Sequence, residues 1–286
     1  MPLMHSRRGF TLVELLIALV LLGMVGAITV RMLTDTQRLT VAQGERANVQ
    51  ATNRVGALVM PAELREINPA LGDILSMSAT SIEYRALRNL AVSCAAPTPT
   101  SVVVSAASVG GLRPSFGMND RILVFVEGDR DDDDDDLWGV GQVSGVAAAT
   151  CPDGTAGILL STGALVYQYD GATPVPGAML ATGAPVRAYE HTTLSAYTDG
   201  EGRTWLGMEV EGDVVQPVVG PLAADGLQFT YRDANGDPTG TATSVRTIDV
   251  AITGQSSRTV HQRGGGSGPG VIVDTISTRV TLRNGL

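Results

Sequence analysis

The chain has 286 residues, of which 44% are hydrophobic and 4% aromatic, and its formal net charge is −9 at pH 7. This length allows one or two domains with a sizeable core, and aliphatic side chains must fill that core because aromatic ones are scarce. The excess of negative charge repels the phosphates of nucleic acids at long range. Direct binding to nucleic acid is therefore not expected.

The first candidate element is an apolar segment from Phe10 to Val30 in which Glu14 is the one charged side chain. A membrane-spanning helix needs about 20 residues, so this segment is long enough to span. Arg7 and Arg8 precede it. By the positive-inside rule, these arginines keep the N-terminus in the cytoplasm and the rest of the chain is exported.

Two simpler interpretations of this segment are a secretory signal peptide and a plain signal anchor. The segment is long for the apolar part of a signal peptide, and Arg31-Met32-Leu33 follows it instead of a small-x-small cleavage site. A plain anchor leaves Glu14 unexplained, because a carboxylate costs about 3 kcal/mol at the centre of a membrane helix. Glu14 is near the end of the segment, where the cost is smaller, so cost alone assigns it no role.

The run Arg7-Arg8-Gly9-Phe10-Thr11-Leu12-Val13-Glu14 closely resembles the class III signal of type IV pilins and type II secretion pseudopilins. The resemblance implies that a prepilin peptidase cuts after Gly9 and that the new N-terminal residue, Phe10, is N-methylated. It also implies that Glu14 pairs with the terminal amine of a neighbouring subunit. In a filament of apolar helices, each charge would otherwise be buried alone at high cost.

Gly23 and Gly26 form a small-x-x-small pair within the same segment. Such a pair allows close helix packing or local melting in a filament. Glycine is also common in membrane helices generally, and this second explanation remains open.

From Met32 to about Ile67 the sequence is amphipathic and predicts that the membrane helix continues outward. We expect one apolar face of this part to pack against a globular head, and this face is formed by Val41, Val55, Leu58, Val59 and Ala62. Pro61 is expected to kink the helix or to begin a new turn, and Asn68-Pro69 to end it.

Beyond residue 70 the apolar patterns shorten to strand length and alternate with turn residues, which is typical of an antiparallel sheet. The predicted strands are 81–87, 102–104, 121–127, 139–144, 157–160, 164–169, 186–190, 204–210, 227–231, 245–253 and 271–283. The strands at 121–127 and 139–144 are expected to form a hairpin.

Two acidic stretches in this region raise the question of cation binding. The first, Asp129–Asp136, contains six consecutive aspartates, which lack the alternating ligand pattern of a calcium loop and favour a solvated hairpin tip. The second, Asp233–Asp237, has no glycine at the position that an EF-hand requires, and its Asn-Gly pair favours a hairpin turn. No metal site is predicted at either.

The two cysteines, Cys94 and Cys151, lie in turn-like contexts. If the head is exported, a disulfide between them is the natural interpretation, and in a reducing compartment they would be free thiols. Their spacing matches no metal-binding pattern.

The C-terminal part has weaker similarities to the same family. The segments at 227–237, 245–252 and 277–284 are similar to the ends of PilW-type minor pilins and of the J-type minor pseudopilin. Residues 90–220 have no such resemblance.

No catalytic, cofactor or metal motif is present in the sequence. His191 follows Glu190 at the end of a predicted strand, which is typical of a surface position. A membrane-anchored exported enzyme is the alternative from a different class, and it would depend on these two residues.

Together these observations predict an α+β, pilin-like protein with a long N-terminal helix packed on an antiparallel β-sheet head. We expect a leader at 1–9, a transmembrane and filament-core helix at 10–30, the second half of the helix at 31–68, and an exported head at 69–286. The resemblance implies a minor pilin in the bacterial inner membrane and in a pilus, with other pilin subunits and the prepilin peptidase as partners. A minor pseudopilin of a type II secretion system is the alternative.

Overall fold

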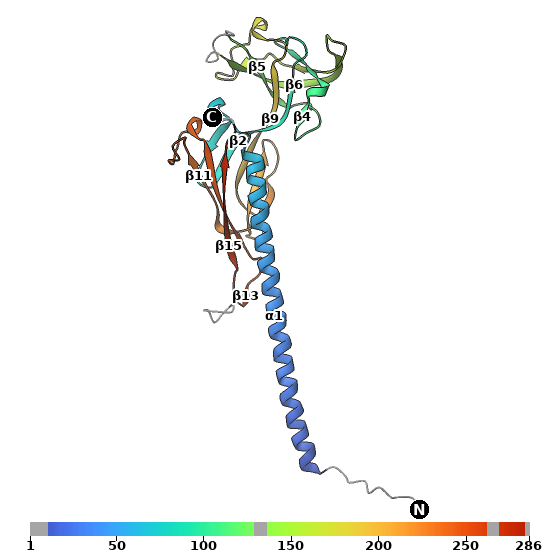
Figure 1. Ribbon diagram of the computed structural model, residues 1–286, viewed down its shortest axis with the longest axis vertical. Helices are drawn as coiled ribbons and strands as arrows, with labels where there is room; N and C mark the ends of the chain where they lie inside the picture. The colour runs from blue at the N-terminus through green and yellow to red at the C-terminus, as the bar shows by residue number, and fades with distance from the viewer. Residues whose placement is uncertain (1–10, 129–135, 262–268, 284–286) are drawn as a thin grey trace, which may run out of the picture.

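The computed structural model describes residues 11–128, 136–261 and 269–283. It consists of one long helix, α1, whose C-terminal part packs on an antiparallel β-sheet head (Figure 1). The predicted α+β fold is therefore confirmed.

Helix α1 runs from Leu12 to Leu64, which at 1.5 Å per residue makes it about 80 Å long. Pro61 lies inside the helix and does not end it. The helix ends earlier than the expected stop at Asn68-Pro69. Asn68 instead starts a short 3₁₀ helix, Pro69–Leu71, and its side chain accepts a hydrogen bond from the backbone of Leu71.

The head contains strands that pair antiparallel throughout the described residues. Their bounds are β1 (Ile74–Met77), β2 (Ser81–Val92), β3 (Ser101–Ser105), β4 (Gly110–Gly111), β5 (Arg121–Val126), β6 (Leu137–Thr150), β7 (Ala156–Thr162), β8 (Val166–Tyr167), β9 (Pro185–Thr198), β10 (Thr204–Val210), β11 (Gln216–Arg232), β12 (Thr247–Gln255), β13 (Val260–His261), β14 (Pro269–Gly270) and β15 (Val273–Thr281). Each predicted strand overlaps one of these, and β5 and β6 form the expected hairpin. The unpredicted strands β1, β4, β13 and β14 are short.

Strands β2 and β9 form the ribbon that connects two lobes of the head. The main sheet follows the order β15-β12-β11-β10-β9-β5-β6-β7-β3, and β2 pairs with β9 along most of its length. In Figure 1 the proximal lobe, with β11 and β15, lies beside α1, and the distal lobe, with β5 and β6, lies beyond the helix end.

Each lobe has its own hydrophobic core. The proximal core combines Met60 and Leu64 of α1 with side chains of β2, β9, β10, β11, β12 and β15, for example Tyr84, Leu206 and Ile248. The distal core is formed mainly by small aliphatic side chains such as Val102, Ile122 and Leu160. Both cores are therefore filled mainly by aliphatic side chains, as the low aromatic content predicts.

A belt of ion pairs centred on the buried Arg88 lies where the end of α1 meets β2 and β9. Arg88 is the extra residue of a β-bulge in β2, and its Nε donates to Glu190 Oε2 at 2.7 Å. Its Nη1 lies 3.3 Å from Oε2 of Glu63, which is in the last turn of α1 and also accepts from the hydroxyl of Tyr84. Arg113 pairs with Glu190 as well. Through Arg88, these ion pairs join the end of α1 to β2 and β9.

The face of α1 that contacts the head is not the predicted one. Its buried residues are Glu45, Val49, Asn53, Gly56, Met60 and Leu64. Val41, Val55 and Leu58 of the predicted stripe are 47%, 45% and 68% exposed, and Ala62 is exposed too. Val59 alone of that stripe packs against the proximal core, half-buried.

The physical reason is that polar and small residues make the observed contact. The Asn53 side chain donates to the carbonyl of Asp274 and accepts from the backbone N–H of Gly254, so two sheet strands are bonded to the helix through one amide. Gly56 lets the sheet approach closely, because a Cβ at this position would lie 2.5 Å from Cδ1 of Ile252. An apolar stripe alone could not have identified this face.

Candidate functional site

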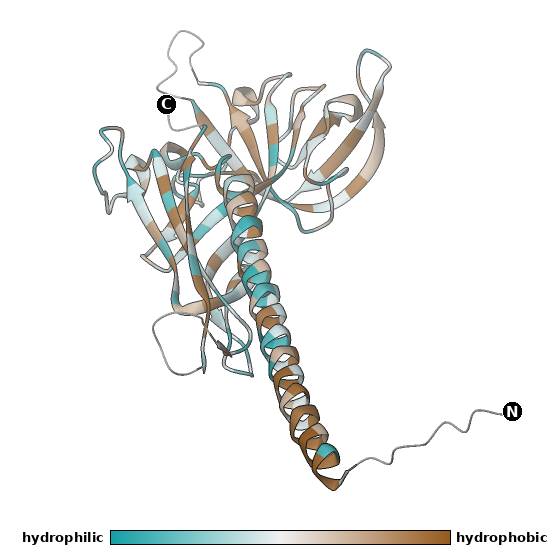
Figure 2. Ribbon diagram, turned by 60° about the horizontal axis from the view of Figure 1, so that its bottom comes forward, coloured by the Kyte–Doolittle hydropathy of each residue, from teal (hydrophilic) through white to brown (hydrophobic). Residues whose placement is uncertain are grey.

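The N-terminal part of α1 extends away from the head. Residues 12–33 are all exposed in the isolated subunit, and Figure 2 shows this end of the helix as almost uniformly hydrophobic. Among the described residues, α1 is the one helix long and apolar enough to cross a membrane. An exposed apolar surface of this size requires a membrane or other apolar helices around it.

Glu14 lies in the first turn of this helix and forms a capping box with Thr11. The Thr11 side chain accepts from the backbone N–H of Glu14 at 3.3 Å, and Glu14 Oε2 accepts from the backbone N–H of Thr11 at 2.9 Å. The same carboxylate oxygen also accepts from the Thr11 hydroxyl at 2.9 Å. Within one subunit, Glu14 therefore satisfies backbone donors at the helix start, which would otherwise lack partners.

Gly23 and Gly26 are both inside α1, which stays helical through them. A Cβ at either position would meet nothing within 4 Å. These glycines therefore serve no packing need inside the subunit, and any close contact at this point involves another molecule.

A family model for the prokaryotic N-terminal methylation motif matches residues 4–30. The chain carries this motif. It is the class III signal peptide of type IV pilin-like proteins, and it includes Gly9, Phe10 and Glu14. The match covers about a tenth of the chain, and no curated protein and no solved structure matched the chain.

The methylation motif begins before the described part of the structure. Gly9 and Phe10 lie outside the described residues, so their predicted roles in cleavage and methylation stay predictions. Thr11 is the first described residue and already caps the helix. The helix therefore begins within two residues of the predicted cleavage point.

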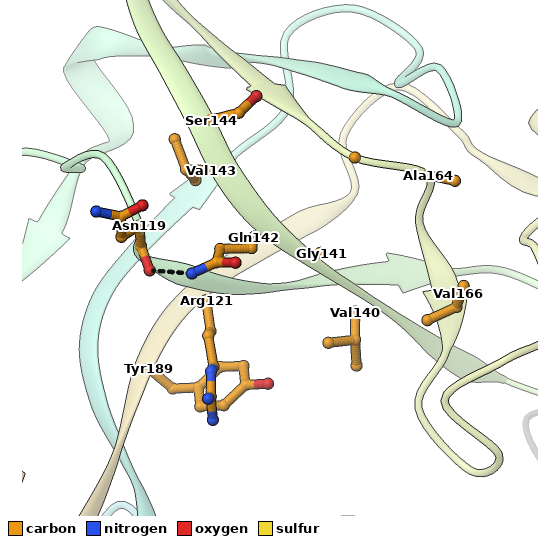
Figure 3. A pocket seen from close by; sticks show the side chains of 11 residues that line it. Asn119, Arg121, Val140, Gly141, Gln142, Val143, Ser144, Ala164, Val166 and Tyr189 are labelled. Atoms are coloured by element: carbon orange, nitrogen blue, oxygen red, sulfur yellow. Dashed lines mark hydrogen bonds between the residues drawn. The ribbon is translucent and has the colours of Figure 1, made fainter. Parts of the chain in front are cut away.

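In the head, far from the methylation motif, strands β5, β6 and β9 border a shallow hollow (Figure 3). Arg121 and Tyr189 lie at one side of it, and Gln142 donates to the backbone carbonyl of Asn119. The positive charge of Arg121 is already paired with a carboxylate, because its guanidinium donates to Glu211 at 2.8 Å. The hollow therefore lacks a free charged group among its described lining residues.

His191 and Glu190, the two residues on which an enzymatic function would depend, do not face each other. Consecutive residues of a strand point to opposite faces. Glu190 lies in the ion-pair belt with Arg88, whereas Nδ1 of His191 lies 2.7 Å from Nη1 of Arg121. Burial, and then the positive charge of Arg121, lower the pKa of His191. The pair forms no acid–base dyad.

Cys94 and Cys151, the pair favoured from the sequence, are joined by a disulfide. Cys94 follows β2 and Cys151 follows β6, so the bond closes the edge of the distal lobe. It lies in the head and not near the methylation motif.

The two acidic stretches differ in what the structure describes. Asp129–Asp135 lie outside the described residues, and Asp136 accepts from the backbone N–H of Gly128 at the base of the β5–β6 hairpin. In the second stretch, Asp233 Oδ1 accepts from the backbone N–H groups of Asn235 and Asp237. This carboxylate therefore stabilises the predicted turn between β11 and β12.

One residue of the site was missed by the sequence analysis. Thr11 and Glu14 form the Thr-x-x-Glu pattern that marks a capping box when it precedes an apolar run. This pattern could have identified Thr11, whereas the resemblance to a pilin signal implies roles for Gly9, Phe10 and Glu14 only.

Proposed function

We propose that this chain is a minor pilin, a structural subunit that helps to start or cap assembly of a type IV pilus. It would be held in the bacterial inner membrane by α1, with a cytoplasmic N-terminus and an exported head. After prepilin peptidase cuts behind Gly9 and Phe10 is methylated, it would join other pilin subunits.

The observation that supports this proposal best is the contrast between the two halves of α1. The second half is fixed to the head by polar contacts, while residues 12–33 are exposed and carry one carboxylate and one guanidinium, Glu14 and Arg31. A helix with this exposed apolar surface can span a bilayer before assembly and pack against similar helices in a filament afterwards. Cleavage would place a new amine at Phe10, four residues before Glu14.

Glu14 has two partners available in this scheme. In the separate subunit it caps its own helix through Thr11. In a filament, the amine of a neighbouring subunit would offer an opposite charge in a water-free environment, where a pair is far more favourable than two separate charges. We infer that the neighbour's amine replaces part of the capping box on assembly.

A pair of variants tests this role. Glu14→Ala removes both the cap and the intersubunit partner, while Thr11→Ala removes only the reciprocal cap. We expect both proteins to reach the membrane, and only Glu14→Ala to be depleted from sheared filaments. Equal depletion of the two variants would show that capping alone matters and would refute the pairing.

A minor pseudopilin of a type II secretion system has the same anchor, processing and partners, and it remains the second candidate. Deletion of the gene separates the two. Loss of surface pili with normal protein secretion supports the minor pilin, and accumulation of secreted enzymes in the periplasm with normal pili supports the pseudopilin.

We propose that the role is structural and not catalytic, because His191 and Glu190 are each engaged by an arginine on different faces of β9. A catalytic activity of the intact protein that disappears in His191→Ala, while the fold is retained, would support the enzyme instead.

A further inference from the structure

A groove lies where α1 leaves the head, between the helix and the β13–β14 hairpin. Figure 1 shows β13 beside α1 at the end of the head that faces the N-terminal half of the helix. The groove has a volume of about 820 Å³. Its walls are the helix from Ile28 to Arg46 and, opposite, Val260 and Ile272.

The groove is positively charged although the chain as a whole is acidic. Arg31, Arg38 and Arg46 line it, and Asp35 is the one acidic residue among its lining residues. Asp35 is 65% exposed and approaches Arg38 only to 4.0 Å, so it neutralises the arginines weakly.

Glu45, the acidic residue next to Arg46, contacts the head and does not line the groove. Its Oε2 accepts from the backbone N–H of Ser257, and the residue is 8% exposed. It is therefore held against the head and leaves the charge of the groove unbalanced. The result is a concave basic site in a protein of formal net charge −9.

The position of this groove along the helix matches the surface of a bilayer. Arg31 directly follows the apolar segment that ends at Val30. A headgroup layer extends about 5–7 Å beyond the hydrocarbon core, so a phosphate in it would lie between Arg31 and Arg38, which is about 10 Å further along the helix and can reach back with its long side chain. Arg46 lies about 22 Å from Arg31 along the helix, beyond this layer. Ile28 and Met32, which are largely exposed, supply apolar surface at the membrane end of the groove.

We propose that this groove binds an anionic phospholipid from the leaflet on the side of the head. The phosphate would lie between Arg31 and Arg38, which offer several N–H donors suited to phosphate oxygens. An acyl chain would lie along Ile28 and Met32, and Val260 would cover the glycerol region. The proposal rests on membrane anchoring and not on the pilin role, so either can fail without the other.

Lipid retention by the intact protein tests this proposal. The full chain in detergent micelles is titrated with phosphatidylglycerol or phosphatidylcholine, and bound lipid is counted by native mass spectrometry. A basic residue near an anionic lipid surface contributes about fivefold in affinity. We therefore expect Arg31→Gln/Arg38→Gln to weaken phosphatidylglycerol binding about 25-fold, and phosphatidylcholine to bind poorly to every variant.

Arg54→Gln is the control for loss of a positive charge on α1, because it removes one from an exposed position that does not line the groove. It should retain phosphatidylglycerol like the unaltered protein. Equal loss in Arg54→Gln, or equal binding of the two lipids, would overturn the proposal.

Two further outcomes would also overturn it. If free glycerol 3-phosphate displaces phosphatidylglycerol at equal concentration, the groove is a site for a soluble phosphate and not for a lipid. If no lipid is retained but the protein forms dimers that Arg31→Gln/Arg38→Gln dissociates, the groove belongs to a second copy of this chain.

Discussion

Thr11 and Glu14 share reciprocal hydrogen bonds at the start of α1. In the capping box, the Glu14 carboxylate stabilises the start of α1 within the subunit. This role is additional to the intersubunit pairing that the resemblance to pilins implies. A side chain with two alternative partners can stabilise the helix before assembly and the filament after it. Substitution at this position therefore needs the Thr11→Ala comparison described above.

Asp249 is a second residue with a measurable electrostatic role. It lies in β12 between Arg279 of β15 and Arg232 of β11, with both arginine Nε atoms 2.6 Å from its carboxylate. The hydrogen bond from Arg279 has the largest effect, and together with the hydrogen bond from Arg232 and both arginine charges it outweighs the opposing effect of burial and lowers the pKa of Asp249 to about 2. The charged carboxylate thus joins three strands.

This depressed pKa predicts a pH-dependent contribution to stability. The contribution is complete above the unfolded pKa of about 4 and is lost as the pH falls toward 2, because the folded state binds its proton later than the unfolded state. Urea unfolding should show Asp249→Asn to be less stable than the unaltered chain at pH 6, with the difference shrinking between pH 4 and pH 2. Asp213→Asn, at an exposed turn, should change little at either pH.

At the scale of single elements, α1 has apolar residues on two opposite faces, and only one of them contacts the head. Met60 is fully buried in the proximal core, whereas Leu58, two residues earlier, is 68% exposed. Met60→Ala should lower the free energy of unfolding by about 2–5 kcal/mol, because it leaves a cavity. Leu58→Ala should change it by less than about 0.5 kcal/mol.

Tryptophan fluorescence of the intact chain in detergent, during urea unfolding, measures both variants. If Leu58→Ala destabilised the head as strongly as Met60→Ala, the face of α1 described here would be incorrect.

Much of the fold was predictable from local patterns. The strand at 121–127 contains an unbroken apolar run at 122–126 and the strand at 81–87 alternates, so both were predictable. Strands β4 and β13 are two residues long and have no pattern to detect. The contact face of α1 was not predictable, because Asn53 and Gly56 are selected by strands some 200 residues away in sequence.

The methylation motif and the basic groove also differ in whether they could be predicted from the sequence. Gly9, Phe10 and Glu14 are adjacent in sequence and form a motif, so they could be identified without a structure. The basic groove could not be, because Val260 reaches Arg38 only through the fold of the whole proximal lobe. Arginines spaced seven and eight residues apart on a helix look like an ordinary solvated face.

For the whole molecule, the two lobes are stabilised in different ways. The proximal lobe packs on α1, whereas the described part of the distal lobe has no α-helix and is closed by the Cys94–Cys151 disulfide. We therefore expect the stability of the distal lobe to depend on oxidising conditions more than the stability of the proximal lobe does.

The disulfide links residues 57 apart in sequence, and a loop of this length stabilises by about 4 kcal/mol if unstrained. Cys94→Ser/Cys151→Ser should therefore unfold at a lower urea concentration than the oxidised protein, by an amount that reduction of the native chain reproduces. Two free thiols in the exported protein, found by non-reducing mass spectrometry, would contradict the pairing.

The most direct test of the central claim is the N-terminus of the protein isolated from the membrane or from filaments. Intact-mass and N-terminal peptide analysis should find a chain that begins at N-methylated Phe10, and Gly9→Ala should leave the uncut precursor. A native protein that retains residues 1–9, or a Gly9→Ala variant cut normally before Phe10, would contradict the account.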